Sequence, residues 1–161
     1  MSYYMNVDEI YRVGVEIEKN GKAFYQAAAA ATADPAVKKL CGELAAWETK
    51  HVELFEALRR KLPAEASEGG AFDPADEESQ YLRATADGHV FVKNKDVGAL
   101  VARCTSPAAL LDLAIEFEKD SAVFYSAMKQ LLPKAQGLDA LIDEELRHIG
   151  LLTAQRAKAG A

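Results

Sequence analysis

The stretch VEIEKNGKAFY at residues 15–25 recurs as IEFEKDSAVFY at residues 115–125, with two Glu, one Lys, one Phe and one Tyr in register. A second match follows each copy, because ETKH at residues 48–51 corresponds to ELRH at residues 145–148. The offset between the copies falls from 100 residues to 97. We therefore expect the second copy to have the shorter turn between its helices. A repeat of this kind predicts two helical hairpins related by a pseudo-two-fold axis, in which equivalent residues face each other.

Capping residues and prolines divide the chain into these hairpins. Asn6 can cap a first helix, and Pro35 and Pro107 each follow a residue that can cap another. Pro63 cannot continue a helix, so it ends the first hairpin. The sequence predicts an all-α four-helix bundle made of two repeated antiparallel hairpins joined by a long crossover. We expect a single domain over residues 1–161, with a hairpin at about 6–61, a crossover with short helices at about 62–105, and a hairpin at about 106–158.

The composition excludes several classes of function. Of the 161 residues, 50% are hydrophobic and the net charge is -6, so nucleic acid is not an expected partner. No apolar run approaches the roughly 20 residues that span a membrane, and residues 1–8 lack the pattern of a signal peptide. We expect a cytoplasmic protein. Cys41 and Cys104 form no CxxC motif, and we expect both to pack in the core.

Ionisable residues interrupt the apolar stripe of each long helix. Residues at i and i+3 share a helix face, so the two Glu-x-x-His motifs each present a carboxylate and an imidazole side by side. The interrupting residues are Glu18, Glu48, His51, Glu118, Glu145 and His148. Small residues flank the acids of the first and third helices, and we expect these to leave room for ions or a small oxidant. They are Gly14, Gly21, Ala114 and Ser121.

Four carboxylates in a bundle core are strongly unfavourable unless their charge is compensated. Two divalent cations balance four negative charges, and neutral imidazoles add ligands without charge. Oxygen and nitrogen ligands suit iron or manganese, whereas structural zinc prefers thiolate. Glu from two helices with Glu-x-x-His from the other two is the di-iron pattern of helical bundles. The alternative is a bundle with buried polar pairs and no metal, since a single Glu-x-x-His motif is a weak signal.

Other ionisable residues have plainer interpretations. Tyr25 and Tyr125, two turns beyond Glu18 and Glu118, are either core aromatics or hydrogen-bond donors that orient the acids. His89 has no acid at a useful spacing, and we expect it at the surface. Several other helical acids should lie on solvated faces. These are Glu16, Glu43, Glu53, Glu56, Glu116 and Glu144.

In these motifs the chain resembles the rubrerythrin group of ferritin-like proteins. The resemblance covers both hairpins, but the chain lacks two features of typical rubrerythrins. One is a further acid in the third helix, where this chain has Ser121, and the other is a rubredoxin module with four cysteines. The resemblance implies two iron ions bridged by Glu48 and Glu145. One ion would be completed by Glu18 and His51, and the other by Glu118 and His148.

The expected activity follows from this resemblance. It implies an oxidoreductase that reduces hydrogen peroxide or dioxygen with electrons from a separate donor protein. Manganese or zinc could substitute for iron. The alternatives are a ferritin-like protein that oxidises or handles iron, and a structural module that a metal stabilises. We expect a homodimer, since two-fold pairing is common among such proteins.

Overall fold

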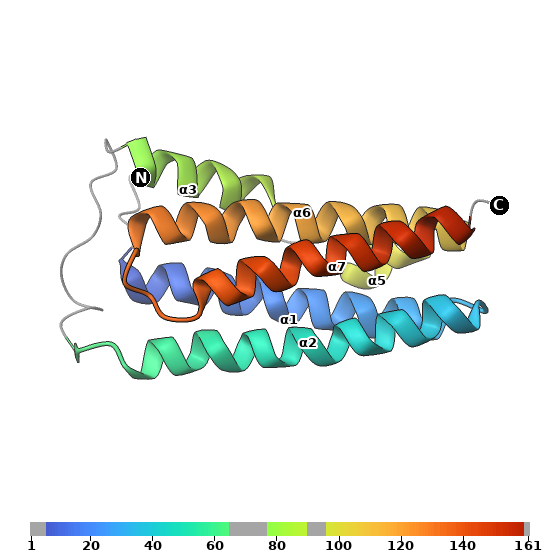
Figure 1. Cartoon of the computed structure of the whole chain (residues 1–161), viewed down its shortest axis with the longest axis horizontal. Coiled ribbons are helices and arrows are strands. Elements are labelled where there is room, and N and C mark those ends of the chain that lie inside the picture. The colour runs from blue at the N-terminus through green and yellow to red at the C-terminus, as the bar shows by residue number, and fades with distance from the viewer. Residues whose placement is uncertain (1–5, 65–76, 90–95, 160–161) are drawn as a thin grey trace.

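Four long helices form the body of the molecule, and in the described part of the crossover two short helices lie on its surface (Figure 1). The computed structural model describes residues 6–64, 77–89 and 96–159. Its helices are α1 (Val7–Ala31), α2 (Pro35–Arg60), α3 (Glu77–Gly88), α5 (Val97–Ala102), α6 (Pro107–Leu131) and α7 (Leu138–Ala159). The two predicted hairpins are therefore α1 with α2 and α6 with α7, and the crossover contains α3 and α5. Other parts of the crossover lie outside the described residues.

The helix starts follow the capping signals of the sequence. The Asn6 side chain accepts a hydrogen bond from the Glu9 backbone N–H, and the Glu9 carboxylate accepts one from the Asn6 backbone N–H. Asp34 caps α2 ahead of Pro35, and Ser106 caps α6. Each such cap stabilises its helix by about 1 kcal/mol. These local signals confirm the predicted starts of three long helices.

The shorter offset in the second copy does not come from a shorter turn. The first hairpin turn comprises residues 32–34, whereas the second comprises residues 132–137, so the expectation of a shorter second turn was wrong. The difference arises in the helices instead. Glu48 lies 13 residues after the start of α2, and Glu145 lies seven residues after the start of α7. The acid of α7 has six fewer helical residues before it than the acid of α2, whereas the connecting turn is only three residues longer. The offset therefore falls by three residues, and both acids still lie at the same level of the bundle.

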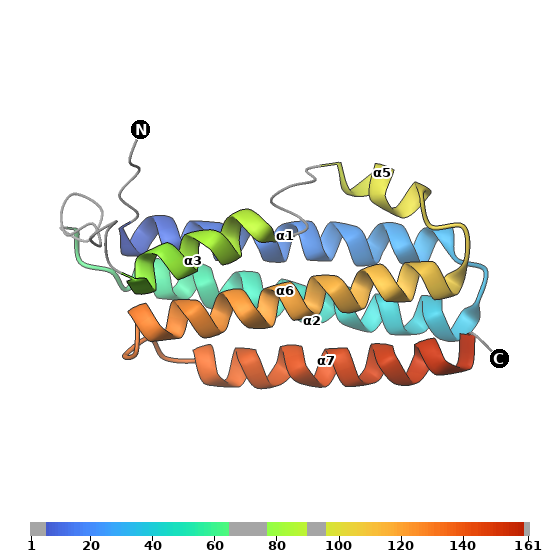
Figure 2. The same ribbon diagram turned by 90° about the horizontal axis from the view of Figure 1, so that it is seen from above.

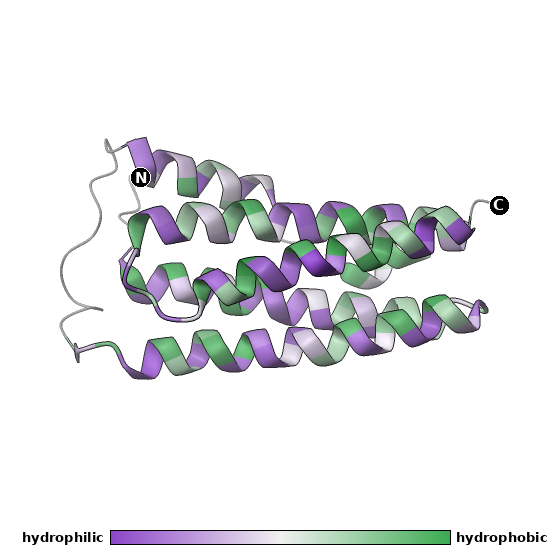
Figure 3. Cartoon of the chain, viewed as in Figure 1, coloured by the Kyte–Doolittle hydropathy of each residue, from purple (hydrophilic) through white to green (hydrophobic). Residues whose placement is uncertain are grey.

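The predicted stripes are buried on every long helix. Figure 3 shows hydrophobic and hydrophilic residues interspersed along each of these helices. Phe24 and Phe124, equivalent in the repeat, are fully buried, as are Phe55 and Phe117. Burying one such ring stabilises the fold by roughly 1.5–3 kcal/mol. Cys41 is 1% exposed in this core, as expected. The core therefore surrounds the ionisable residues with apolar side chains above and below their level.

The short crossover helices cover two of the long ones. α3 packs along α6, and α5 packs along α1, on the side of the bundle away from α7 (Figure 2). Within the described ranges, no helix has the length and apolar character needed to cross a membrane. The crossover therefore adds a partial outer layer to the four-helix bundle.

Candidate metal centre

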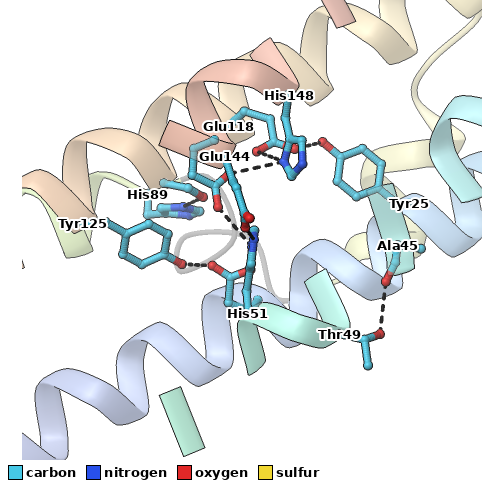
Figure 4. A network of polar contacts seen from close by, with 12 residues as sticks. Tyr25, Ala45, Thr49, His51, His89, Glu118, Tyr125, Glu144 and His148 are labelled. Carbon is cyan, nitrogen blue, oxygen red and sulfur yellow. Dashed lines mark hydrogen bonds and ion pairs between the residues drawn. The ribbon is translucent and has the colours of Figure 1, made fainter. Parts of the chain in front are cut away.

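Six buried side chains from the four long helices meet within the bundle, and Figure 4 labels three of them, His51, Glu118 and His148. α1 and α6 each supply one carboxylate, and α2 and α7 each supply a carboxylate and an imidazole. The six residues are Glu18, Glu48, His51, Glu118, Glu145 and His148. None of them is more than 2% exposed. The structure thus brings together every residue that the repeat singled out as a ligand.

One group of donors combines both hairpins around His51. Ligand atoms of Glu18, His51 and Glu145 lie within 4.8 Å of one another. The Nδ1 atom of His51 is 3.1 Å from Glu18 Oε2 and 3.2 Å from Glu145 Oε1. Burial disfavours the charged imidazole, but the adjacent carboxylates of Glu145 and Glu18 outweigh it and raise the pKa of His51 to about 11. His51 is therefore a cation in the metal-free protein and offsets part of the buried negative charge.

A second group combines the hairpins around His148. Ligand atoms of Glu48, Glu118 and His148 also lie within 4.8 Å of one another. Burial first, and then neighbouring carboxylates, raise the pKa of Glu48 and of Glu118 well above the usual range. The rings of His51 and His148 stack with centroids 5.9 Å apart, so the two groups are adjacent.

Many polar atoms at the centre have no hydrogen-bond partner among residues 6–64, 77–89 and 96–159. The atoms are both carboxylate oxygens of Glu48 and of Glu145, Oε2 of Glu118, and both ring nitrogens of His148. Leaving one buried donor or acceptor unsatisfied costs about 1–3 kcal/mol, and more for a charged group. Divalent cations satisfy such atoms directly, and the mixed oxygen and nitrogen set suits iron or manganese. The residues present therefore fit a pair of metal ions.

The two tyrosines of the repeat hold acids of the opposite hairpin. The Tyr25 hydroxyl donates a hydrogen bond to Glu118 Oε1, and the Tyr125 hydroxyl donates one to Glu18 Oε1 (Figure 4). Both tyrosines are fully buried. Burial, and then the neighbouring carboxylates, raise the pKa of both phenols well above 10. Both hydroxyls therefore remain protonated and orient the carboxylates, which is the second of the two interpretations left open by the sequence.

Glu144 does not lie on a purely solvated face, contrary to our expectation. Its Oε2 atom is 2.9 Å from Nε2 of His51, and its side chain is 34% exposed. The contact passes from one hairpin to the other, and nothing in the repeat predicts it, because Trp47 occupies the equivalent position. A carboxylate that accepts from the second nitrogen of an imidazole orients the ring as a metal ligand.

His89 is buried, so its expected surface location was wrong. It is 0% exposed, and its Nε2 atom is 3.1 Å from Ser121 Oγ. Its ring packs edge-on against Phe117, with centroids 5.6 Å apart. Burial lowers the pKa of His89 to about 4, although the charge of Glu145 opposes this. The packing of the crossover on α6 places this histidine, and no helical spacing in the sequence could reveal it.

Two of the small residues beside the acids accommodate aromatic rings rather than leaving open space. A Cβ atom at Gly21 would lie 2.5 Å from Cζ of Phe117 and 2.7 Å from Oε2 of Glu48. A Cβ atom at Gly14 would lie 2.9 Å from Cζ of Phe55. The expectation of room for an oxidant was therefore wrong at these two glycines. They permit close packing around the acids instead.

The remaining acids follow the expected pattern. Glu16, Glu43, Glu53 and Glu116 are exposed, and Glu56 is half-buried. Glu16 and Glu116 each precede a buried acid by two residues and face solvent, as the helical spacing predicts. They provide matched controls for the buried acids of α1 and α6.

Comparisons with known proteins support the fold. No protein-family model matches the chain, and no curated protein matches it. Among solved structures, one from Thermotoga maritima is described as a "putative ferritin-like diiron-carboxylate protein". It matches 98% of each chain with a TM-score of 0.66 and 23% sequence identity. The chain therefore has the all-α ferritin-like fold.

Proposed function

We propose that the chain is a rubrerythrin-like di-iron oxidoreductase that reduces hydrogen peroxide or dioxygen. The observation that supports this most directly is the pair of buried donor groups, in which seven oxygen and nitrogen atoms have no hydrogen-bond partner within the described structure. A ferritin-like fold with these ligands, and the description of the Thermotoga protein, agree with a di-iron centre.

The ligands divide between the two ions along the two groups. Glu18, His51 and Glu145 would hold one ion, and the other group would hold the second. By the resemblance to rubrerythrins, Glu48 and Glu145 would be shared between the ions. When bound, two ferrous ions would supply Lewis acidity and two electrons. Two electrons are enough to reduce one hydrogen peroxide to two waters with the uptake of two protons.

The chain itself would position the ligands and keep out bulk water. Tyr25 and Tyr125 fix one oxygen of Glu118 and of Glu18, and leave the other oxygen of each carboxylate for a metal. The complete burial of the acids excludes competing solvent and strengthens their electrostatic interactions. On this proposal a separate donor protein returns the electrons, and the chain acts as a cytoplasmic homodimer.

Anaerobic loading with ferrous iron followed by peroxide tests the proposal. We expect about two iron ions per chain and consumption of about one peroxide for each pair. Glu18→Ala and Glu118→Ala should lose iron and peroxide consumption together. Glu16→Ala and Glu116→Ala, which remove exposed acids two residues away, should retain both.

Other outcomes would separate the alternatives. An iron-loaded protein that leaves peroxide and dioxygen unreduced would overturn the oxidoreductase proposal. If iron then raised only the melting temperature, the metal would be structural. A hollow assembly of high solution mass that accumulates iron beyond two ions per chain would indicate iron storage instead.

A further inference from the structure

The residue before each Glu-x-x-His motif breaks the two-fold symmetry of the centre. Trp47 precedes Glu48, and Glu144 precedes Glu145 at the equivalent position of the repeat. Each lies beside the histidine of the opposite hairpin. The two histidines therefore have chemically different neighbours from the opposite hairpin: a carboxylate at His51 and an indole ring at His148.

An anionic acceptor supports His51. The Nδ1 atom of His51 faces Glu18 and Glu145 within the first group, at 3.1 and 3.2 Å. Its Nε2 atom is 2.9 Å from Glu144 Oε2. Once a metal occupies Nδ1, a carboxylate at that distance accepts a hydrogen bond from the Nε2–H group. This bond fixes the ring in the tautomer that binds metal through Nδ1, and it raises the basicity of the imidazole.

Among the residues that the structure describes, no comparable acceptor supports His148. Its Nδ1 atom is 3.6 Å from Glu118 and 3.8 Å from Glu145, and its buried Nε2 atom has no hydrogen-bond partner. The ring of Trp47 lies beside it, with centroids 5.9 Å apart. An indole N–H can donate a hydrogen bond but cannot accept one, so Trp47 cannot take the role of Glu144.

The charges near Trp47 also differ in sign from that of Glu144. The Lys50 Nζ atom lies 3.8 Å from the centroid of the Trp47 ring, and the Arg147 Cζ atom lies 4.7 Å from it. These cation–π contacts hold the ring in place and add positive charge on the side of His148. On the side away from the donor groups, His51 thus contacts the Glu144 carboxylate, whereas His148 lies beside the Trp47 ring and its two cations.

We infer that the two metal positions are inequivalent, and that the position formed by Glu18, His51 and Glu145 binds its ion more tightly. This inference rests on the proposed di-metal centre. The loss of an outer carboxylate partner typically lowers metal affinity by about 10–100-fold. In the described part of the chain His51 has that partner and His148 does not, so the first ion enters at His51 and leaves last.

Titration of the metal-free protein with Co²⁺ alone tests this order, by calorimetry and by the visible absorption of the bound ion. We expect two binding steps whose dissociation constants differ by about 10–100-fold. His148→Ala should retain the tight step, and His51→Ala should retain only the loose one. These two variants assign the steps to positions without reference to any reaction.

Glu144→Gln tests the cause. It should weaken the tight step by about 10-fold or more and bring the two steps together. Asp143→Asn, which removes the adjacent exposed charge, should leave both steps unchanged. Equal affinities in the unmodified chain, a tight step that persists in Glu144→Gln, or an equal effect of Asp143→Asn would overturn the inference. Failure of any Co²⁺ to bind would instead overturn the di-metal centre itself, and peroxide inertness would overturn neither.

Discussion

The phenol of Tyr25 donates a hydrogen bond to the carboxylate of Glu118, a residue of the other hairpin that lies 93 positions further along the chain. Tyr125 and Glu18 form the reciprocal bond. Each buried acid of α1 and α6 is therefore oriented by the helix that faces it across the two-fold axis. Tertiary packing, and not the local spacing of Tyr and Glu on one helix, positions these carboxylates.

Removing either phenol should weaken the fold and the metal centre together. Tyr25→Phe leaves a buried oxygen of Glu118 without its donor, so we expect the metal-free protein to lose about 1–3 kcal/mol of unfolding free energy. Metal affinity should fall by about 10-fold or more, since the carboxylate loses its orientation. Urea denaturation and competition with a chelator measure the two effects. Tyr81→Phe, at a residue that is 52% exposed, is the control and should change neither.

The metal-free protein should become less stable as the pH rises from about 5 to 9. Glu48 and Glu118 have pKa values raised above their ordinary 4.5, and the pKa of His51 is raised from 6.5 to about 11. The folded state therefore binds more protons than the unfolded state throughout this range, and stability falls with a slope of about 1.4 kcal/mol per pH unit for each extra proton. The lowered pKa of Glu145 acts in the opposite sense, but only below about 4.5. The pKa of His89, lowered from 6.5 to about 4, also acts in the opposite sense and offsets part of the slope below about pH 6.5.

Melting temperatures measured in a chelator across this range test the sign. A stability that rises toward pH 9 would contradict the protonated state of these buried groups. His51→Gln should reduce the slope between about pH 7 and 9, since it removes a group whose pKa is raised to about 11. Asp143→Asn should leave the slope unchanged, because that residue is exposed.

Two glycine substitutions should have opposite effects. Gly21→Ala places a methyl group 2.5 Å from the Phe117 ring and 2.7 Å from Glu48, so we expect a loss of about 1–3 kcal/mol and impaired metal binding. Gly150→Ala meets no atom within 4 Å, and it should stabilise α7 by roughly 0.5–1 kcal/mol. Denaturant unfolding and elemental analysis of both variants provide the measurement. Equal effects at the two positions would refute the close packing at Gly21.

A double-mutant cycle should detect the bond between His89 and Ser121. We expect His89→Phe and Ser121→Ala each to destabilise the protein, because each leaves the other polar group without this partner. The double variant should lose less than the sum, with a coupling of about 1 kcal/mol. Additive losses would indicate that the 3.1 Å contact contributes nothing to stability.

The sequence predicted the long helices and the six central residues because each depends on a local or periodic signal. Caps such as Asn6 and Asp34 act within one turn, and the apolar stripes follow the helical period. The repeat then indicated which polar residues face the axis. Whether these residues bind metal, and which metal, stays a prediction.

Contacts between elements were not predictable in the same way. His89 precedes a stretch outside the described residues and owes its burial to the docking of α3 on α6. Glu144 was assigned to the solvated side by its helical position, yet the side chain reaches across to α2. The glycines of α1 were interpreted as leaving space, although large rings from other helices fill it. Each of these three errors concerns a contact with another helix, and spacing along one helix carries no information about such contacts.

Both donor groups take members from each half of the chain, since Glu18 and His51 meet Glu145, while Glu48 meets Glu118 and His148. A single hairpin on its own would offer three of the six groups and could complete neither set. Such a hairpin could assemble this centre only by pairing with a second copy of itself around a two-fold axis. The crossover joins the two hairpins in one chain at a one-to-one ratio, so equivalent positions need not carry the same residue, as Trp47 and Glu144 illustrate.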